Sequence, residues 1–368
     1  MLGTQPAAVD HEPRSTVTPE PDADESRRDP DRSRAPVPSS RPGNPDHSPS
    51  LSLVIPAYNE AARLAEGVQR LLGAADNGAF DLAATEILLV DDGSTDGTDV
   101  LGRQLLGHLP HARVLSLPHA GKGAAVRAGI AAATAPRLAY IDADMSIYPT
   151  QLPDLLSALE RSDIAVGSRT LADSKDDSES LRRTVMGRIF NRLVNLTTHV
   201  SLGDTQCGFK GFRTPVAQLL FHFSTVDRYA FDVEVLWLAR RLGCSITQVP
   251  VHWAHVGGSR VRPVADPLSM VFDVARSRLD PRQARSVPAL SVAPAGLQDP
   301  ATTIRSVLGD NVPLVREPNG STLALFPLSS PERLDQARER LAVVFPSPGP
   351  TRRLLSLEQL LQLAPLHL

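Results

Sequence analysis

From Leu51 onward, short apolar runs alternate along the chain with stretches of helical periodicity. The runs typical of buried strands are Leu51–Ile55, Glu86–Val90, Arg113–Leu117, Leu138–Ile141 and Ile164–Gly167. Between them, apolar residues recur at helical spacing in Glu60–Leu72, Thr95–Leu106, Lys122–Ala133 and Thr150–Leu159. This alternation predicts an α/β domain with a doubly wound, mostly parallel sheet. Because ligands of such sheets bind beyond the carboxyl ends of the strands, the polar residues that follow each strand are the functional candidates.

The second half of the chain has a less regular pattern. It predicts helices over Leu181–Val200, near Phe231–Leu242 and near Pro267–Leu279, a loop over Gly203–Phe212 and a strand over Ser245–Val251. Residues 281–302 are rich in Pro and Ala and predict a linker. Beyond it we expect a small α+β module, with a strand at Thr322–Leu328 and helices at Pro331–Val344 and Leu354–Leu363. No motif in this tail indicates a role.

The first 49 residues differ in composition from everything that follows. They contain ten prolines, many charges and no aromatic side chain. Such a segment buries too little apolar surface to offset the entropy lost on ordering, so we expect it to be disordered. The predicted organisation is therefore a tail (1–49), a main α/β domain (50–280), a linker (281–302) and a C-terminal module (303–368).

Composition and charge narrow the class of protein. The net charge of −3 over 368 residues gives no overall attraction to nucleic acid. Two cysteines, Cys207 and Cys244, argue against a disulfide scaffold and fit a reducing compartment. No run approaches 18 apolar residues, and the N-terminus lacks a basic segment followed by an apolar one. We therefore expect a soluble cytoplasmic protein.

Three of the predicted strands lead into acidic or aromatic groups. The first ends in Val54-Ile55-Pro56-Ala57-Tyr58-Asn59-Glu60, the second in Val90-Asp91-Asp92-Gly93-Ser94-Thr95-Asp96-Gly97, and the fourth in Asp142-Ala143-Asp144. A nucleotide diphosphate needs a seat for its base, a divalent cation and donors for its oxygens. Asp142 and Asp144 point the same way from an extended segment and can share contacts to ribose and metal. Mg²⁺ or Mn²⁺ prefers such carboxylate oxygens together with substrate phosphates.

Each of these motifs also has a simpler explanation when it is taken alone. Asp142-Ala143-Asp144 could be a solvated turn, and Asp91–Gly97 could be a turn with a helix cap. Gly121-Lys122-Gly123 could be a turn before a helix, although its N–H groups and lysine would suit an anion. Their occurrence at successive strand ends of one sheet favours a nucleotide-diphosphate site.

Taken together, the motifs resemble those of a known enzyme family. Val54–Glu60, Asp91–Gly97, Gly121–Gly123 with Arg127, and Asp142–Asp144 resemble family 2 glycosyltransferases of the GT-A fold. Gly203–Lys210, Arg228–Glu234, His252-Trp253 and Gly258–Arg260 resemble the dolichyl-phosphate (polyprenyl-phosphate) beta-glucosyltransferase branch. The resemblance runs from about Leu51 to Leu279, over three-fifths of the chain, and the Asp204–Lys210 string is its most specific part.

The resemblance implies a fold, an activity and roles for matched residues. The fold would be GT-A, and the activity inverting transfer of a hexose, expected to be glucose, from a UDP-sugar to a polyprenyl phosphate at the cytoplasmic membrane face. The donor site would comprise Pro56, Tyr58, Glu60, Val90, Asp92, Lys122 and Asp142. Asp144, with Asp142, would hold Mg²⁺ or Mn²⁺ on the diphosphate, and Arg169 would lie near the phosphates as a catalytic residue.

The chemistry of the acceptor decides whether a general base is needed. A lipid monophosphate has a second pKa of about 6, so it is already anionic and nucleophilic at pH 7. Catalysis would then rest on positioning and charge stabilisation. The arginines available near the acceptor are Arg169, Arg183, Arg228 and Arg260. If the acceptor is instead a hydroxyl of a soluble molecule, Asp232 or Glu234 becomes the necessary base.

Some features depart from the family pattern, and other readings stay open. Ser146 stands where the mannosyl branch often has glutamine, Arg260 where the glucosyl branch commonly has lysine, and no match exists for the N-terminal membrane helix of eukaryotic members. The arginine-bearing helix Leu181–Val200 could contact the membrane surface or simply pack on the sheet. A phosphatase with an aspartyl nucleophile and a non-catalytic binding protein that works through Thr303–Leu368 are the remaining alternatives.

Overall fold

The structure is a computed structural model. It describes residues 48–171, 175–176, 202–253, 273, 276, 285–293, 299–309, 311–329, 331–345 and 349–363. All of them belong to one compact unit, Gly43–Leu368. The predicted disordered tail lies outside the described residues, apart from its last two residues. The predicted helix Leu181–Val200 also lies outside them, as does most of the predicted helix Pro267–Leu279.

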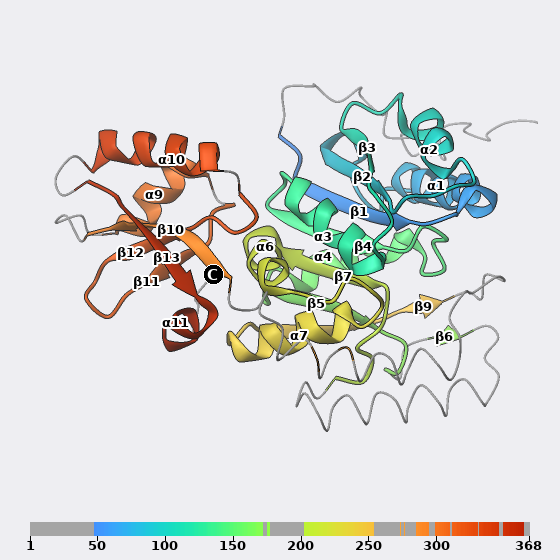
Figure 1. Cartoon of the computed structure of the whole chain (residues 1–368). Coiled ribbons are helices and arrows are strands. Elements are labelled where there is room, and N and C mark those ends of the chain that lie inside the picture. The colour runs from blue at the N-terminus through green and yellow to red at the C-terminus, as the bar shows by residue number, and fades with distance from the viewer. Residues whose placement is uncertain are drawn as a thin grey trace, which may run out of the picture. The chain divides into compact units, whose positions relative to one another are not determined.

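A mixed sheet forms the centre of the larger part of the chain (Figure 1). Its strands are β1 (Leu51–Ala57), β2 (Thr85–Asp91), β3 (Ala112–Ser116), β4 (Arg137–Ile141), β5 (Ile164–Ser168), β7 (Phe209–Arg213) and β8 (Ile246–Pro250). Their order is β3-β2-β1-β4-β7-β5-β8. Only β7 runs antiparallel to its neighbours, β4 and β5. The predicted doubly wound, mostly parallel α/β sheet of GT-A type is confirmed.

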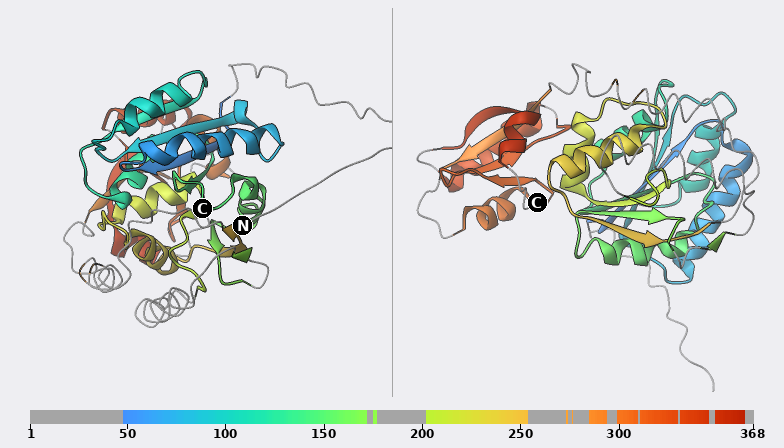
Figure 2. Two further views of the ribbon diagram at one scale, coloured as in Figure 1. Left: turned by 90° about the vertical axis from the view of Figure 1, so that its right-hand side faces the viewer. Right: turned by 90° about the horizontal axis from the view of Figure 1, so that it is seen from below.

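Helices cover both faces of this sheet (Figure 2). On one face, α1 (Ala61–Asp76), α2 (Thr98–Leu106) and α4 (Leu152–Ala158) contribute to one buried cluster. On the other, α3 (Lys122–Ala132), α6 (Thr214–Phe223) and α7 (Phe231–Arg241) contribute to a second. Alternate residues of β1 supply the two clusters, with Val54 on the α3 face and Leu53 and Ile55 on the α1 face. Burial on both faces explains why β1 and β2 are continuous apolar runs.

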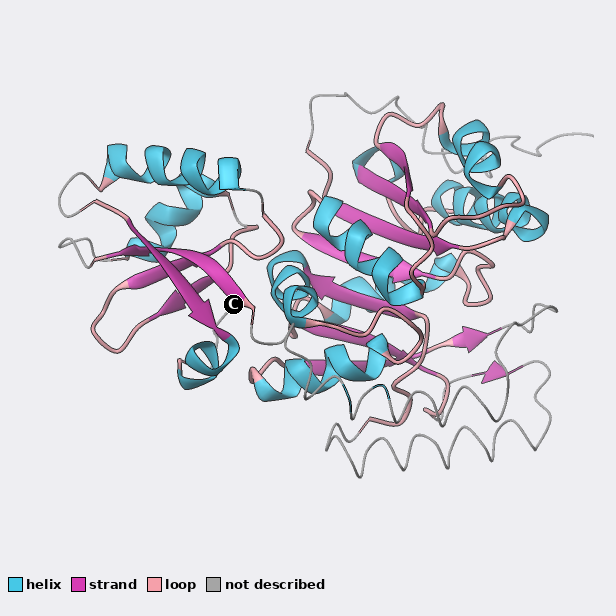
Figure 3. Cartoon of the chain, in the orientation of Figure 1, coloured by secondary structure: helices cyan, strands magenta, loops and turns pink. Residues whose placement is uncertain are grey.

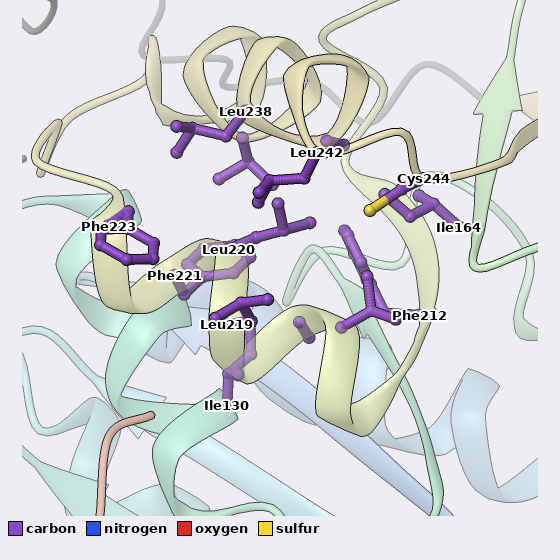
Figure 4. Close-up of a cluster of buried hydrophobic side chains, with 14 of the residues drawn as sticks. Ile130, Ile164, Phe212, Leu219, Leu220, Phe221, Phe223, Leu238, Leu242 and Cys244 are labelled. Atoms are coloured by element: carbon purple, nitrogen blue, oxygen red, sulfur yellow. The ribbon is translucent and has the colours of Figure 1, made fainter. Parts of the chain in front are cut away.

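The cluster beneath α6 and α7 is rich in large side chains (Figure 4). The helices contribute Leu219, Leu220, Phe221, Phe223, Leu238 and Leu242, which gather with Phe212 of β7 and Ile164 of β5. These contacts fix α7 against the sheet. The N-terminal turn of α7, which carries Asp232 and Glu234, is thereby held in place.

The prediction of a loop over Gly203–Phe212 is wrong from Phe209 onward, where strand β7 begins. The pattern misled because Lys210, a residue that is rarely buried, lies in the middle of this strand and is fully buried. Its charge is compensated by Asp232, which comes from a distant part of the sequence. Helix α6, which follows directly, was also not predicted.

The C-terminal segment forms a second, antiparallel sheet with the order β11-β12-β10-β13 (Figure 3). Its elements are β10 (Ser286–Val292), α9 (Pro300–Leu308), β11 (Leu314–Arg316), β12 (Thr322–Leu325), α10 (Pro331–Val344), β13 (Thr351–Ser356) and α11 (Leu357–Gln362). The succession β-α-β-β-α-β with this strand order is a split βαβ arrangement. Residues of β10, α9 and α10, among them Leu290, Ile304 and Leu341, share a buried cluster. The expected small α+β extension is therefore present.

Two strands of this segment contradict the sequence-based expectation, and α9 and β11 were not predicted at all. Ser286–Val292, expected to be linker, is a strand that pairs with both β12 and β13. Thr351–Ser356 overlaps the expected terminal helix but is strand β13, and only Leu357–Gln362 is helical. In both cases the strand is specified by its pairing partners rather than by its own pattern.

The remaining short elements lie at the periphery of the main sheet or form small pairings. They are the 3₁₀ turns η1 (Leu82–Ala84) and η2 (Pro149–Gln151) and the two-stranded pair β6 (Lys175–Asp176) and β9 (His252–Trp253). Across the ranges that the structure describes, no helix combines the length and apolar character needed to cross a membrane.

Candidate active site

The loops that follow β1 and β2 are fastened to each other at the carboxyl edge of the sheet. Asn59 lies in the left-handed region with φ 51°. Its backbone N–H donates to Ser94 Oγ at 2.8 Å, and its side-chain oxygen accepts from the N–H of Thr95 at 2.8 Å. The N–H of Glu60 donates to Thr98 Oγ1 at 2.8 Å. Tyr58 and Glu60, two of the predicted donor residues, are thus held at fixed positions on this edge.

Asp92 fastens a third loop, the one that precedes α3. Its buried carboxylate accepts from the backbone N–H groups of Ala120 and Gly121, each at 2.9 Å, and lies 2.9 Å from His119 Nδ1. Gly121 has a φ of 124°, and a Cβ at this position would lie 2.4 Å from the carbonyl oxygen of Asp227. Glycine is therefore required here. The predicted donor residue Asp92 organises this turn in the structure.

The turn at Gly121 brings Lys122 to the end of β4. Lys122 Nζ lies 2.5 Å from Asp142 Oδ1. Burial alone would lower the pKa of Lys122, but the carboxylates of Asp142 and Asp232 outweigh that effect and raise it, so the lysine is a permanent cation. Gly208 makes room for this pair, because a Cβ there would lie 2.1 Å from Asp142 Oδ2. The prediction that these strand ends meet at one place is confirmed for Lys122 and Asp142.

Asp144 lies one turn further along the same loop and is contacted from α1. Its Oδ1 accepts from the N–H of Ser146 at 3.0 Å, and its Oδ2 lies 3.7 Å from Arg63 Nη1. The loop approaches α1 closely because Gly67 has no side chain; a Cβ there would lie 2.2 Å from the carbonyl oxygen of Ala143. Helix α1 and the loop after β4 are thus in direct contact at the predicted metal site.

The donor set at this loop fits a hard divalent cation that brings further ligands with it. Asp142 and Asp144 supply carboxylate oxygens of the kind that Mg²⁺ and Mn²⁺ prefer. Within the part of the chain that the structure describes, no group of three or more His, Cys, Asp or Glu could hold a metal ion. Substrate phosphates are ligands that Mg²⁺ commonly takes together with one or two carboxylates.

The aromatic side of the donor site consists of Tyr58 and a partner that the sequence did not reveal. The rings of Tyr58 and His119 are stacked, with centroids 4.1 Å apart and planes 19° apart. Pro56 is buried within β1. Val90 is fully buried in the core and faces α3, so its predicted contact with the donor is not available to its side chain.

The two carboxylates considered as alternative bases are both buried. Asp232 Oδ1 accepts from Lys210 Nζ at 2.6 Å and from the hydroxyl of Tyr140. Glu234 accepts from Ser224 Oγ at 2.7 Å, Thr225 Oγ1 at 2.8 Å and the N–H of Val226 at 2.9 Å. Neither presents an exposed carboxylate in this structure. Both instead hold α7 to the strands and loops around it, which does not favour their role as a base.

The predicted arginines are placed differently from one another. Arg169 grips the buried carboxylate of Asp204 through Nε at 2.7 Å and Nη2 at 3.1 Å, and lies 5.9 Å from the centre of the Trp253 ring. Burial would raise the pKa of Asp204, but Arg169 lowers it overall. Arg228 is exposed at the start of α7, in the loop that contacts Gly121. Arg183 and Arg260 lie outside the described residues.

Three residues of this region were not predicted from the sequence: Arg63, His119 and Lys210. The sequence held one local signal, for Arg63: it stands three residues after Glu60, and oppositely charged residues at this spacing on a helix are neighbours. His119 and Lys210 are brought to the site by tertiary contacts. The exposed ring of Tyr229 also lies close enough to Lys122 to affect its pKa.

Comparison with known proteins agrees with this geometry. The family described as Glycosyl transferase family 2 matches residues 52–221. "Dolichyl-phosphate beta-glucosyltransferase" of Drosophila melanogaster is 37% identical over 247 residues, covering 62% of this chain and 75% of the relative. The protein of the same name from Dictyostelium discoideum is 32% identical over 247 residues, covering 64% and 76%. The resemblance predicted from the strand-end motifs is confirmed.

Among solved structures, glucosyl-3-phosphoglycerate synthase from Mycobacterium tuberculosis, in complex with Mn²⁺, UDP and glucosyl-3-phosphoglycerate, aligns with a TM-score of 0.46 at 21% identity. The alignment covers 76% of this chain and 88% of that chain.

Proposed function

The chain belongs to glycosyl transferase family 2, and from this premise we propose that it transfers glucose from UDP-glucose to a polyprenyl phosphate, with inversion at the sugar carbon. It is a glycosyltransferase, as the named relatives are. Both the sugar and the class of acceptor are inferred from the names of those relatives. The remaining support comes from the arrangement of charges at the carboxyl edge of the sheet.

The observation that carries the proposal on the donor side is the meeting of charged groups from three separate segments: the start of α3, the loop after β4, and α1. Lys122 with Asp142, and Arg63 with Asp144, place two carboxylates and two cations at the sheet edge that also carries the stacked ring of Tyr58. An aromatic face suits a nucleobase, carboxylates suit ribose hydroxyls and a metal, and cations suit phosphate oxygens. This combination fits a nucleoside diphosphate sugar.

A divalent metal bound by Asp144, with Asp142, would supply Lewis-acid stabilisation of the departing diphosphate. The chain's own contribution is positioning. Asp92 holds the turn that aims Lys122, and Glu60 holds the guanidinium of Arg63. A donor diphosphate bound here would meet these two cations without a large rearrangement of the backbone, which is how preorganised charge lowers a barrier.

The acceptor side supports a phosphate rather than a hydroxyl nucleophile. A hydroxyl needs a base to remove its proton, whereas a lipid phosphate is already ionised at pH 7. Asp232 and Glu234, the two residues considered for that base, are buried and hydrogen-bonded. The exposed Arg228, in the loop that contacts Gly121, is a cation suited to an anionic acceptor.

We further propose that the reaction takes place at the cytoplasmic face of a membrane, with the enzyme as a peripheral protein. A polyprenyl chain is confined to the bilayer, whereas a sugar nucleotide is water-soluble, so the two substrates meet at the surface. Both cysteines are buried free thiols, which fits a reducing compartment.

Incubation with a panel of sugar nucleotides, a short polyprenyl phosphate and Mg²⁺ or Mn²⁺, followed by mass spectrometry of the lipid fraction, tests the proposal. We expect a lipid phosphate carrying one hexose, formed fastest from UDP-glucose. Sugar transfer to water-soluble products alone would overturn the lipid acceptor, and release of no UDP under any condition would favour a binding protein instead.

A further inference from the structure

Each of the two carboxylates that follow β4 already has a cation beside it. Lys122 Nζ lies 2.5 Å from Asp142 Oδ1, and Arg63 Nη1 lies 3.7 Å from Asp144 Oδ2. A metal ion arriving alone would therefore approach two carboxylates that each have a cation beside them. Two positive groups within a few ångströms oppose a divalent cation at the same oxygens.

Arg63 is held in this position by a specific geometry. Its Nε donates to Glu60 Oε2 at 2.8 Å and its Nη2 donates to Glu60 Oε1 at 2.7 Å, which is the two-pronged contact that a planar guanidinium makes with a carboxylate. The remaining amino group, Nη1, is the one directed at Asp144. At 3.7 Å this is a charge contact rather than a hydrogen bond, so it can be given up easily.

We propose that Arg63 is a positioning residue that makes binding of the metal and of the donor diphosphate depend on each other. With Lys122, it occupies the carboxylates while the site is empty of donor. When metal and diphosphate arrive together, the metal takes Asp144 and the cations turn to the phosphate oxygens. The site then exchanges one set of ion pairs for another instead of burying an unbalanced charge.

This inference rests on the proposed donor class and goes beyond it, because it predicts a coupling between two ligands. Neither ligand alone relieves the charges at the site. The metal alone takes Asp142 from Lys122 and leaves Arg63 with Glu60 as its partner, and the nucleotide alone draws both cations away from Asp142 and Asp144. Such coupling between sites is typically 5- to 150-fold in affinity, or about 1–3 kcal/mol. We expect a value in that range for UDP and Mn²⁺ in the wild-type protein.

Isothermal titration of the full-length protein with Mn²⁺ alone, with UDP alone and with UDP in the presence of Mn²⁺ measures this coupling directly. For Arg63→Gln we expect Mn²⁺ alone to bind more tightly, by about 5-fold, and UDP with Mn²⁺ to bind more weakly, by about 10-fold, both within the usual size of such couplings. These opposite changes would not follow from general damage to the site, which weakens both ligands.

Two further variants sharpen the test. Arg63→Lys cannot make the two-pronged contact with Glu60, but it keeps the positive charge that opposes the metal. Its affinity for Mn²⁺ alone should therefore stay near that of the wild type. Arg70→Gln removes the same charge from the same helix, but Arg70 forms its ion pair with Glu66 and contacts the carbonyl oxygen of Met145 rather than a carboxylate of the site. Its affinities for both ligands should change much less than those of Arg63→Gln. Melting curves of all variants exclude unfolding as a cause.

The proposal is overturned if Arg63→Gln binds Mn²⁺ alone no more tightly than the wild type, or if its changes equal those of Arg70→Gln. That outcome leaves the donor class intact, because wild-type protein would still bind UDP. Failure of the wild type to bind UDP with either metal would instead overturn the proposed donor, and this inference with it.

Discussion

Two pairs of carboxylates lie near the carboxyl edge of the main sheet, and they differ in solvent exposure and in the partners that they contact. Asp142 and Asp144, after β4, keep 38% and 23% of their side-chain surface exposed and face the side chains of Lys122 and Arg63. Asp232 and Glu234, on α7, are 4% and 0% exposed and accept hydrogen bonds from residues packed around them.

The difference separates carboxylates that can exchange partners from those that cannot. An ion pair that stays partly in contact with water contributes less to stability than a fully buried one, so a ligand can replace it at smaller cost. A buried carboxylate that loses its partner leaves an uncompensated charge, which is strongly destabilising. We therefore propose that the pair after β4 binds ligand, whereas the pair on α7 holds the fold.

The largest effect on stability should come from breaking the buried ion pair between Lys210 and Asp232. Lys210→Met leaves Asp232 buried without its cation, and we expect a loss of about 3–5 kcal/mol in the free energy of unfolding. Urea denaturation followed by circular dichroism measures it. The double variant Lys210→Met/Asp232→Asn should recover part of this loss. A single-variant loss below about 1 kcal/mol would contradict a structural role for the pair.

On the exposed side, Asp144→Asn should affect activity and leave the fold unchanged. Loss of one charge that stabilises a transition state typically costs about 100- to 1000-fold in rate. We expect a fall of that size in kcat/KM for transfer, with a melting temperature close to the wild-type value. A variant that retains most of its activity would remove Asp144 from the site, and one that unfolds would place it with the buried pair.

Asp204 offers an intermediate case, because it is buried while its partner Arg169 is half exposed. Arg169 holds the pKa of Asp204 below the usual value for an aspartate, so its ionised form stabilises the fold above about pH 4, and this contribution is lost as the pH falls through the folded-state pKa. Asp204→Asn should cost about 1.5 kcal/mol at pH 6 and less at pH 3. Urea denaturation at the two pH values tests this; an equal cost at both would contradict it.

The smallest effect should come from the aromatic stack. Replacing His119 by Ala removes the ring that packs on Tyr58, a contact of about 0.5–1.5 kcal/mol beyond its buried area. We expect KM for the donor to rise about 3-fold at unchanged kcat, and His119→Phe to restore it. Steady-state kinetics with varied donor concentration measure this. An unchanged KM in His119→Ala would argue against binding of the nucleobase at the Tyr58–His119 stack.

Much of the donor side could be predicted from the sequence, because each of its motifs follows a strand whose pattern is itself clear. The common position of Tyr58, Asp92 and Asp142 at one edge follows from the rule that ligands bind beyond the carboxyl ends of parallel strands, whereas their roles toward a donor were implied by the family resemblance. Val90 was the exception: it is the next-to-last residue of β2, is fully buried and is directed into the core. The direction of a single side chain at a strand end does not follow from the motif.

What could not be predicted depends on partners that are distant in the sequence. Lys210 lies in a strand because Asp232 compensates its charge, and no local pattern indicates that. Strand β10 contains Pro288, which disfavours a strand with neighbours on both sides, yet the carbonyl of Pro288 accepts from the N–H of Phe326. Arg63 belongs to the site only because Gly67 lets α1 approach the loop after β4.

The central claim of the proposed function is that Asp142 and Asp144 serve donor binding while neither Asp232 nor Glu234 serves as a base, so we propose an acceptor that is ionised already. Initial rates with UDP-glucose and two acceptors that share one short prenyl chain, the monophosphate and the free alcohol, test it most directly. We predict glucosylation of the phosphate and at least about 100-fold slower reaction of the alcohol, as expected where general-base catalysis is lacking. Comparable rates with both acceptors would contradict the account.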